Sequence, residues 1–202
     1  MNSKGFFNQF YKNATELSYE KSLLDFFEQN IRARLSNHKI NILELGGGAY
    51  SLFEEVSNLE AEVTSIDFSS VAILKAPLSQ IKYREINLID PSFFEKEMFD
   101  LVFDSHCLNC LTDETERELA FKNIFSSLKP GGLFASELMV QPPNESVSIP
   151  FKKIKLAMEL EREILSHGFK ILYFVISRQS GFTSLVEGVE VRCDLLRVVG
   201  RK

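Results

Sequence analysis

Three consecutive glycines at positions 46–48 constrain the fold more than any other feature of the sequence. They follow the apolar run Ile40–Leu45, which is typical of a buried strand. Glycine has no Cβ atom, so the backbone can turn sharply there and approach a ligand closely. Ser51 and Glu54 then have the spacing of a capping box and predict the start of a helix. A strand, a glycine turn and a helix in this order are typical of the ligand-binding edge of an open α/β sheet.

The alternation of short apolar runs with amphipathic stretches continues along the chain. Helices are indicated after Asp113, which has Glu116 three residues later, and before Gly168, a typical helix stop. Strands that alternate with helices form a parallel sheet covered on both faces. Buried strands are predicted at Ile40–Leu45, Glu62–Ile66, Ile81–Leu88, Leu101–Phe103 and Leu133–Val140.

Two further strand-like runs, Phe169–Ser177 and Val189–Gly200, follow without a helix between them. Strands joined in this way are expected to pair as an antiparallel hairpin, because a parallel crossover needs a longer connection, usually a helix. We therefore expect an α/β fold, a three-layer sandwich. Its seven-stranded, mostly parallel sheet should have an antiparallel last strand and helices on both faces.

Charge and composition narrow the classes of partner. The chain has 23 Lys and Arg against 28 Asp and Glu, and its net charge of −5 argues against nucleic acid, since phosphate binding relies on basic residues. No apolar run approaches the ~20 residues of a membrane helix, and no secretory signal is apparent, so we expect no membrane association. The three cysteines are expected to be reduced thiols of a cytoplasmic protein. No feature of the sequence indicates an oligomeric state.

The glycine segment fits three ligand-binding templates to different degrees. A dinucleotide fingerprint, G-x-G-x-x-G, is matched by Gly46 and Gly48 but has Ser51 at its third position. A P-loop needs Lys followed by Ser or Thr, which this segment lacks. The pattern E-x-G-x-G-x-G is matched by Glu44, Gly46 and Gly48, with Tyr50 in place of its last glycine. The segment therefore favours an adenosine-containing ligand over a nucleoside triphosphate.

Polar residues also end the next two predicted strands. Asp67 ends the second, where its carboxylate can accept hydrogen bonds from both ribose hydroxyls of an adenosine. Its position suits NAD and S-adenosylmethionine equally, and a cap for a helix beginning near Ser69 is the alternative role. Asn87 ends the third strand, and its carbonyl oxygen can accept a hydrogen bond from the adenine amino group. Asp90 competes for that role, and a simple turn residue is the other interpretation of Asn87.

Two more segments follow in order, F-D-L-V at 99–102 and L-K-P-G-G at 128–132. Together with the glycine loop and Asp67 they extend over residues 41–139, and this order resembles the class I S-adenosylmethionine-dependent methyltransferases. The resemblance disfavours a dehydrogenase and implies S-adenosyl-L-methionine as the cofactor. The residues that it implies as cofactor-binding are Glu44, Gly46, Gly47, Gly48, Asp67, Phe68, Asn87, Leu88, Asp104 and Tyr11.

The resemblance also implies one methyltransferase domain over residues 1–202. We divide it into an N-terminal helical cap (1–36), a cofactor-binding core (40–140) and a segment with substrate loop, helix and terminal hairpin (141–202). Tyr11 in the cap is expected to fold over the cofactor. The loops Gln141–Pro150 and Gln179–Gly188, the second with Phe182, are expected to border the substrate pocket.

His106, just after the fourth strand, is the candidate general base, because an imidazole titrates near neutral pH. A capping or packing role is the alternative. His106, Cys107 and Cys110 are too few for a tetrahedral zinc site, so no metal is expected. We expect methyl transfer to a small-molecule acceptor. A protein or RNA acceptor, or a non-catalytic module that binds S-adenosylmethionine, are the alternatives.

Overall fold

The computed structural model describes residues 3–14, 21–36, 38–178, 182–183 and 190–202. Its α-helices are α1 (Ser3–Asn13), α2 (Lys21–Phe26), α3 (Ser70–Lys75), α4 (Glu114–Ser127) and α5 (Ala157–Ser166). A π-helical turn, η1 (Phe27–Ile31), continues α2, and short 3₁₀ turns are η2 (Arg32–Arg34), η3 (Leu52–Glu54), η4 (Pro91–Phe93) and η5 (Leu108–Cys110). The strands are β1 (Ile40–Leu45), β2 (Ala61–Asp67), β3 (Lys82–Glu85), β4 (Phe99–Ser105), β5 (Leu128–Val140), β6 (Lys170–Ser177), β7 (Phe182–Thr183), β8 (Glu190–Val191) and β9 (Asp194–Arg201).

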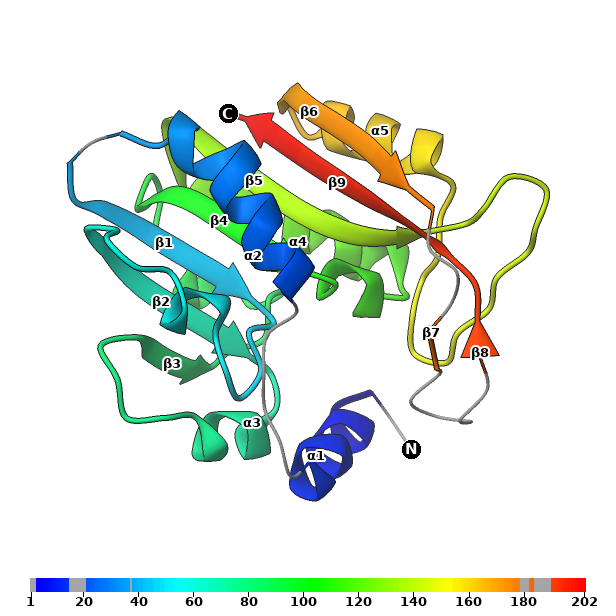
Figure 1. Cartoon of the computed structure of the whole chain (residues 1–202), viewed down its shortest axis with the longest axis horizontal. Coiled ribbons are helices and arrows are strands. Elements are labelled where there is room, and N and C mark those ends of the chain that lie inside the picture. Colours follow the sequence, from blue (N-terminus) through cyan, green and yellow to red (C-terminus); the bar gives the residue numbers. More distant parts are fainter. Residues whose placement is uncertain (1–2, 15–20, 37, 179–181, 184–189) are drawn as a thin grey trace.

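Seven strands form one sheet in the order β3-β2-β1-β4-β5-β9-β6 (Figure 1). The pairs from β3 to β5 are parallel, whereas β9 is antiparallel to both β5 and β6. Among the described residues, β7 and β8 form a separate two-stranded ribbon. The predicted α/β sandwich with an antiparallel last strand is therefore confirmed, and so is the pairing of the two C-terminal strands as a hairpin.

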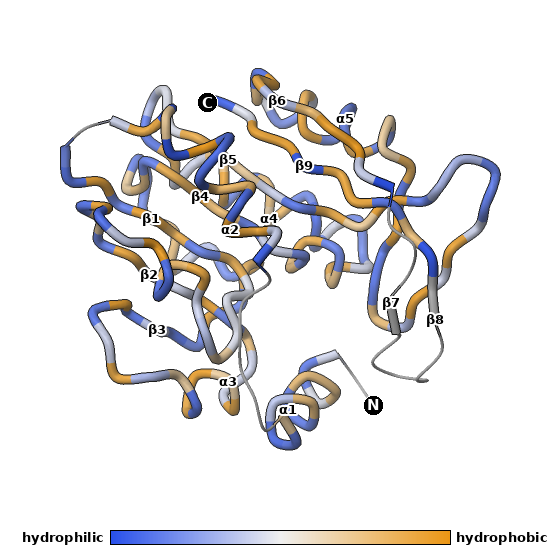
Figure 2. The backbone as a smooth tube through the Cα atoms, viewed as in Figure 1, coloured by the Kyte–Doolittle hydropathy of each residue, from blue (hydrophilic) through white to orange (hydrophobic). Residues whose placement is uncertain are grey.

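Side chains of the central strands alternate between the two faces of the sheet. On β4, Leu101 and Phe103 pack with α2 and η1 on one face, while Val102 packs with α4 and α5 on the other. Figure 1 shows α2 in front of the sheet and α4 behind it. Figure 2 shows hydrophobic residues concentrated along β1, β4, β5 and β9. Burial on both faces explains why these strands read as nearly continuous apolar runs.

The helix predicted after the glycine loop does not form. Over residues 46–60, all of which the structure describes, the only helical segment is the single turn η3. Ser51 caps this turn, because its hydroxyl accepts a hydrogen bond from the N–H of Phe53. The face that such a helix would cover is filled by the N-terminal segment instead. There the ring of Phe27 packs edge-to-face on Phe53, 5.3 Å between centroids, and on Phe103, 6.4 Å.

Two other expectations need correction. The run Ile81–Leu88 was predicted as a buried strand, but β3 is shorter and largely exposed, because it lies at the sheet edge with polar residues. The N-terminal helical cap expected over residues 1–36 is divided, and α1 lies apart from α2, beyond the carboxyl ends of the strands (Figure 1). No helix in the described part of the chain is long and apolar enough to cross a membrane.

Candidate functional site

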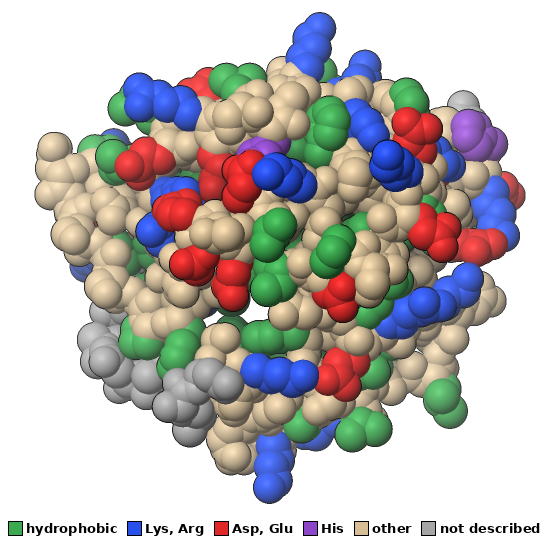
Figure 3. All heavy atoms as spheres, turned by 180° about the vertical axis from the view of Figure 1, so that it is seen from behind, with side chains coloured by type: hydrophobic (Ala, Val, Ile, Leu, Met, Phe, Trp, Pro, Cys, Tyr) green, Lys and Arg blue, Asp and Glu red, His purple; other side chains and the backbone are tan. Residues whose placement is uncertain are grey.

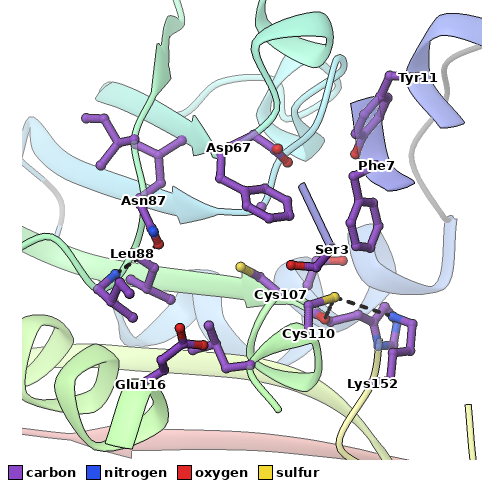
Figure 4. A pocket seen from close by; sticks show the side chains of 18 residues that line it. Ser3, Phe7, Tyr11, Asp67, Asn87, Leu88, Cys107, Cys110, Glu116 and Lys152 are labelled. Atoms are coloured by element: carbon purple, nitrogen blue, oxygen red, sulfur yellow. Dashed lines mark hydrogen bonds between the residues drawn. The ribbon is translucent and has the colours of Figure 1, made fainter. Parts of the chain in front are cut away.

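A cavity of about 220 Å³ lies beyond the carboxyl ends of the parallel strands. Residues that end or follow β1, β2, β3 and β4 form its inner wall, and Ser3, Phe7 and Tyr11 of α1 contribute to its outer wall (Figure 4). Figure 3 shows a hollow in the lower half of the molecule as seen from behind. Open α/β sheets bind ligands at this edge, so the topology itself marks the cavity as the candidate site.

The glycine loop leaves no room for side chains at two of its positions. Gly46 lines the cavity at φ +65°, and a Cβ there would lie 2.6 Å from the Cβ of Cys107. At Gly47, a Cβ would overlap the hydroxyl of Ser65 and the carboxylate of Glu44. Real Cβ atoms do not approach neighbours so closely. Bare backbone therefore borders the cavity at this point.

Glu44 holds the loop from beneath and does not line the cavity. One carboxylate oxygen accepts a hydrogen bond from the N–H of Leu52 (2.9 Å) and the other from the hydroxyl of Ser65 (2.7 Å). Burial raises the pKa of Glu44, although these hydrogen bonds oppose the effect. Glu44 is therefore not among the residues that border the cavity, and its direct contact with a cofactor stays a prediction. These two hydrogen bonds of its carboxylate link β1 to β2 and to η3.

Asp67 is brought to the cavity, and its carboxylate is tied to backbone at both oxygens. Oδ1 accepts from the N–H of Ser69 (2.8 Å) and Oδ2 from the N–H of Gly48 (3.2 Å). Burial raises the pKa of Asp67 to about 6. Gly48 does not line the cavity, because the hydroxyl of Tyr11 lies over it and would collide with a Cβ there. Both interpretations of Asp67, a cavity carboxylate and a support for the turn into α3, are thus compatible with its position.

Phe68, Asn87 and Leu88 lie along the same wall of the cavity. The side-chain oxygen of Asn87 accepts a hydrogen bond from the N–H of Ile89 (3.3 Å), as expected of a turn residue. Asp90, the competing residue, does not line the cavity and caps η4 through the N–H of Ser92. An amide thus remains as the polar side chain beside the apolar surfaces of Phe68 and Leu88.

The segment after β4 contributes His106, Cys107 and Cys110 to the cavity, but not Asp104. Asp104 is fully buried, and its oxygens accept from the hydroxyl of Ser136 (2.6 Å) and the N–H of Leu108 (3.1 Å). Ser136 lies opposite it in the β4–β5 register, so the carboxylate is held within the sheet layer. Burial raises its pKa to about 6. Asp104 therefore lies behind the cavity wall, and its contact with a cofactor stays a prediction.

His106 is part of a chain of three charged or titratable side chains, in which Glu137 is fully buried and His106 and Arg197 are partly buried. Its Nε2 lies 3.0 Å from Oε1 of Glu137, and Oε2 of Glu137 accepts a hydrogen bond from Nε of Arg197 (2.6 Å). Burial alone would raise the pKa of Glu137, but His106 and Arg197 outweigh it and lower the pKa. Glu137 is therefore ionised, and its Oε1 faces Nε2 of His106 without a hydrogen bond to it or to any other described residue. Nδ1 of His106 is likewise buried and has no hydrogen-bond partner among the described residues.

Three residues that belong to this site or border it were not predicted from the sequence: Glu137, Arg197 and Lys152. Glu137 pairs with Ser105 of β4 on one side and with Arg197 of β9 on the other. Its signal was a charged residue within the apolar run 133–140, since lone charges in a buried strand need partners. Lys152 lines the cavity from the connection between β5 and α5.

Of the two substrate loops expected to border the pocket, the structure describes Gln141–Pro150 in full. Gln141–Pro150 itself does not line the cavity, and the chain reaches it just afterwards, at Lys152. Most of Gln179–Gly188, and the side chain of Phe182, lie outside the described residues. All three cysteines are free thiols, and among the residues described no group of three or more His, Cys, Asp and Glu is arranged to hold a metal ion.

Part of the chain matches the model of a known protein family. The family model of a methyltransferase domain matches residues 43–136, which include the glycine loop, Asp67 and His106. No curated protein matches the sequence.

Solved structures of similar fold cover nearly the whole chain. A SAM-dependent methyltransferase from Methanosarcina mazei is 17% identical, with a TM-score of 0.66 over 92% of this chain and 99% of that one. The N-methyltransferase NodS from Bradyrhizobium japonicum WM9, in complex with S-adenosyl-L-homocysteine, is 19% identical, with a TM-score of 0.68 over 100% and 99%. The [4+2]-cyclase SpnF is 16% identical, with a TM-score of 0.71 over 95% and 85%. At these identities the likeness establishes the fold.

Proposed function

Because the chain belongs to the class I S-adenosylmethionine-dependent methyltransferases and uses S-adenosylmethionine as its cofactor, we propose that its methyl acceptor is a small molecule. The observation that carries this proposal is the cavity of about 220 Å³ with α1 in its outer wall. Phe7 and Tyr11 of α1 line this cavity together with His106, so an acceptor would have to fit beside these two rings. A net charge of −5 also disfavours RNA.

The residues around the cavity fit the cofactor. Position 46 has no room for a side chain beside Cys107, so backbone alone would border the ligand there. We propose that Asp67 accepts hydrogen bonds from the ribose hydroxyls, as a carboxylate can do in bidentate fashion. Phe68 and Leu88 would contact the adenine, and Asn87 would accept a hydrogen bond from its amino group.

Tyr11 completes this proposed cofactor site from α1. Its hydroxyl lies over Gly48, and its pKa is raised by burial and by the neighbouring carboxylate of Asp67. It is therefore a neutral hydrogen-bond donor at physiological pH. Glu44, Gly47, Gly48 and Asp104 act one layer further out in this proposal, by fixing the loop and the end of β4.

S-adenosylmethionine, when bound, supplies a methyl group activated by its sulfonium charge. The part we assign to His106 is to accept the proton that the acceptor loses. Oε1 of Glu137 lies 3.0 Å from Nε2 of the imidazole, so the carboxylate is close to the positive charge that protonation of the ring creates. The ionised Glu137 then compensates the positive charge of the imidazolium, and Arg197 keeps Glu137 ionised. General-base catalysis of this kind is typically worth ~10²–10⁴-fold in rate.

A turnover screen tests the proposal. Purified protein is incubated with S-adenosylmethionine and pools of small hydroxyl, amine and thiol compounds, and release of S-adenosylhomocysteine is measured. We expect turnover with at least one small molecule. His106→Gln should lower kcat by ~10²-fold or more, whereas His38→Gln, at an exposed position, should not.

Two outcomes of the same screen would contradict the proposal. Methylation of total protein or RNA alone would indicate a macromolecular acceptor. Tight binding of S-adenosylmethionine without any turnover would indicate a binding module, or another reaction on the same fold, as the cyclase SpnF illustrates. We also propose a cytoplasmic location, which the three free thiols support.

A further inference from the structure

Lys152 places a positive charge on one side of the cavity (Figure 4). The side chain is half-buried, and Nζ lies 3.8 Å from Sγ of Cys110. In Figure 4 it lies on the opposite side of the cavity from Asn87 and Leu88. The wall with Asn87 and Leu88 is the one proposed for the adenine. Lys152 therefore lies in the part of the cavity that the proposed cofactor site leaves to the acceptor.

Lys152 differs from its two nearest lysines because it forms no ion pair with a carboxylate of the described residues. Lys153 forms an ion pair with Glu114 at 3.0 Å, and Lys155 forms one with Glu114 at 2.9 Å. Within the described part of the chain, no carboxylate oxygen is paired with Lys152 at 4.0 Å or less. A lysine that is partly withdrawn from water without an anion is costly unless a partner is supplied.

The neighbouring thiols do not supply that anion. Burial raises the pKa of Cys110, although Lys152 opposes the effect, and burial also raises the pKa of Cys107. Both thiols are therefore protonated at neutral pH. Among the described residues, Asp67 and Glu116 also line the cavity, and neither carboxylate forms an ion pair with Lys152 at 4.0 Å or less.

The backbone around Lys152 is firmly held. The side chain of Asn109 donates to the carbonyl oxygens of Met139 (3.1 Å) and Lys153 (3.0 Å), and the carbonyl of Asn109 accepts from the N–H of Lys153 (2.6 Å). Phe151, at φ +61°, stacks on Phe6 of α1 with 5.1 Å between ring centroids. The connection is thus fastened to η5, β5 and α1, which fixes the position from which Lys152 reaches the cavity.

We propose that Lys152 is the anion-binding residue of the acceptor site, and that the acceptor is a small molecule carrying a carboxylate or a phosphate monoester. This inference rests on the proposed small-molecule function. A lysine ammonium binds either anion as a point charge with three donors, so the two chemistries share one site. The carboxylate of the cofactor itself is the competing partner, and the test separates it from the acceptor.

Binding of small probes to the protein saturated with S-adenosylhomocysteine tests the inference. The probes are benzoate, phenyl phosphate and the neutral benzamide, titrated by calorimetry or by ligand-observed NMR. We expect at least one anion to bind ~10-fold or more tightly than benzamide, as charge-assisted hydrogen bonds permit. Lys152→Met should abolish this preference, whereas Lys152→Arg should retain most of it. Lys153→Met is the matched control and should retain it fully.

The affinity for S-adenosylhomocysteine, measured on the same variants, completes the test. We expect Lys152→Met to leave it within about threefold of the wild type, which is about 0.7 kcal/mol. A large loss of that affinity would assign Lys152 to the cofactor carboxylate and overturn the inference. Absence of any preference for an anion in the wild type, or its persistence in Lys152→Met, would also overturn it. These readouts need no turnover, so they are independent of failure in the acceptor screen.

Discussion

Replacing Asp67 with asparagine is expected to stabilise the free protein at neutral pH and to weaken its binding of the cofactor. The carboxylate is 7% exposed. Burial raises its pKa from 3.8 to about 6, although the N–H groups of Ser69 and Gly48 oppose the effect. The folded protein thus carries an ionised group in an unfavourable place above this pH. Asparagine has nearly the same shape and no charge to bury.

The sign and size of the effect follow from this pKa. Below about pH 4 the carboxyl is protonated in the folded and unfolded chain alike, and burial costs nothing. As the pH rises from about 4 to about 6, the unfolded chain loses its proton first, so the free energy of unfolding falls. The difference between 3.8 and about 6 corresponds to about 3 kcal/mol.

Asparagine keeps one of the two backbone hydrogen bonds and loses the other, at a cost of about 1 kcal/mol. Relative to wild type, Asp67→Asn should therefore be about 2 kcal/mol more stable near pH 8 and about 1 kcal/mol less stable near pH 4. Binding should change in the opposite direction, because the amide gives up the charge-assisted contacts to ribose. We expect a loss of ~10-fold or more in affinity for S-adenosylhomocysteine near pH 8.

Urea unfolding of both proteins across pH 4 to 8, with calorimetric titration of S-adenosylhomocysteine, measures the two effects. Wild-type affinity should itself fall as the pH drops below about 6 and Asp67 becomes protonated, whereas the variant should bind weakly throughout. A stability difference that does not change with pH would refute the reasoning on burial. Unchanged affinity in the variant would refute the proposed ribose contact.

Three more substitutions probe the loop and the end of β4. Gly46→Ala places a Cβ within 2.6 Å of the Cβ of Cys107, at φ +65°. The variant should therefore be about 2 kcal/mol less stable in thermal unfolding and show no measurable cofactor binding. Normal binding would show that the loop tolerates a side chain. Asp104→Asn should resemble Asp67→Asn in the pH dependence of its stability, since burial raises both pKa values. Its affinity for the cofactor should stay within about threefold of the wild type. A large loss of that affinity would indicate that Asp104 contacts the ligand. Glu137→Gln should lower kcat by ~10-fold or more and leave the KM for S-adenosylmethionine unchanged, because a neutral amide cannot compensate the charge of a protonated His106. If Glu137→Gln alone lost no activity, while His106→Gln and the double variant lost the same amount, a positioning role for Glu137 would be excluded.

Local sequence patterns predicted those parts of the fold that depend on local chemistry. Asp113 caps α4 by accepting hydrogen bonds from the N–H groups of Thr115 and Glu116, and Gly168 follows α5 at φ +92°. The buried central strands were visible as apolar runs. The absence of a helix after the glycine loop could not be predicted from local sequence, because Ser51 does cap a turn there. The space of the expected helix is taken by Phe27, which comes from a segment distant in sequence.

In the candidate site, too, some residues could be predicted from local sequence patterns and others only from tertiary contacts. Asp67, Asn87 and His106 end or follow strands, so the sheet topology alone brings them to one edge. Glu137 could not be predicted, because its neighbours are set by the register of β5 with β4 and with β9, which the sequence does not give. Lys152 was hidden because the path of a long connection depends on tertiary contacts such as the Phe151–Phe6 stack. Motifs at strand ends thus located the cavity, but the residues proposed for the acceptor side required the structure.

The most direct test of the account is a crystal structure of the protein with S-adenosylhomocysteine. We predict the adenosyl group in the cavity beside Phe68 and Leu88, with both ribose hydroxyls within about 3.2 Å of the Asp67 carboxylate oxygens. A ligand bound elsewhere, or a ribose without contact to Asp67, would contradict the account.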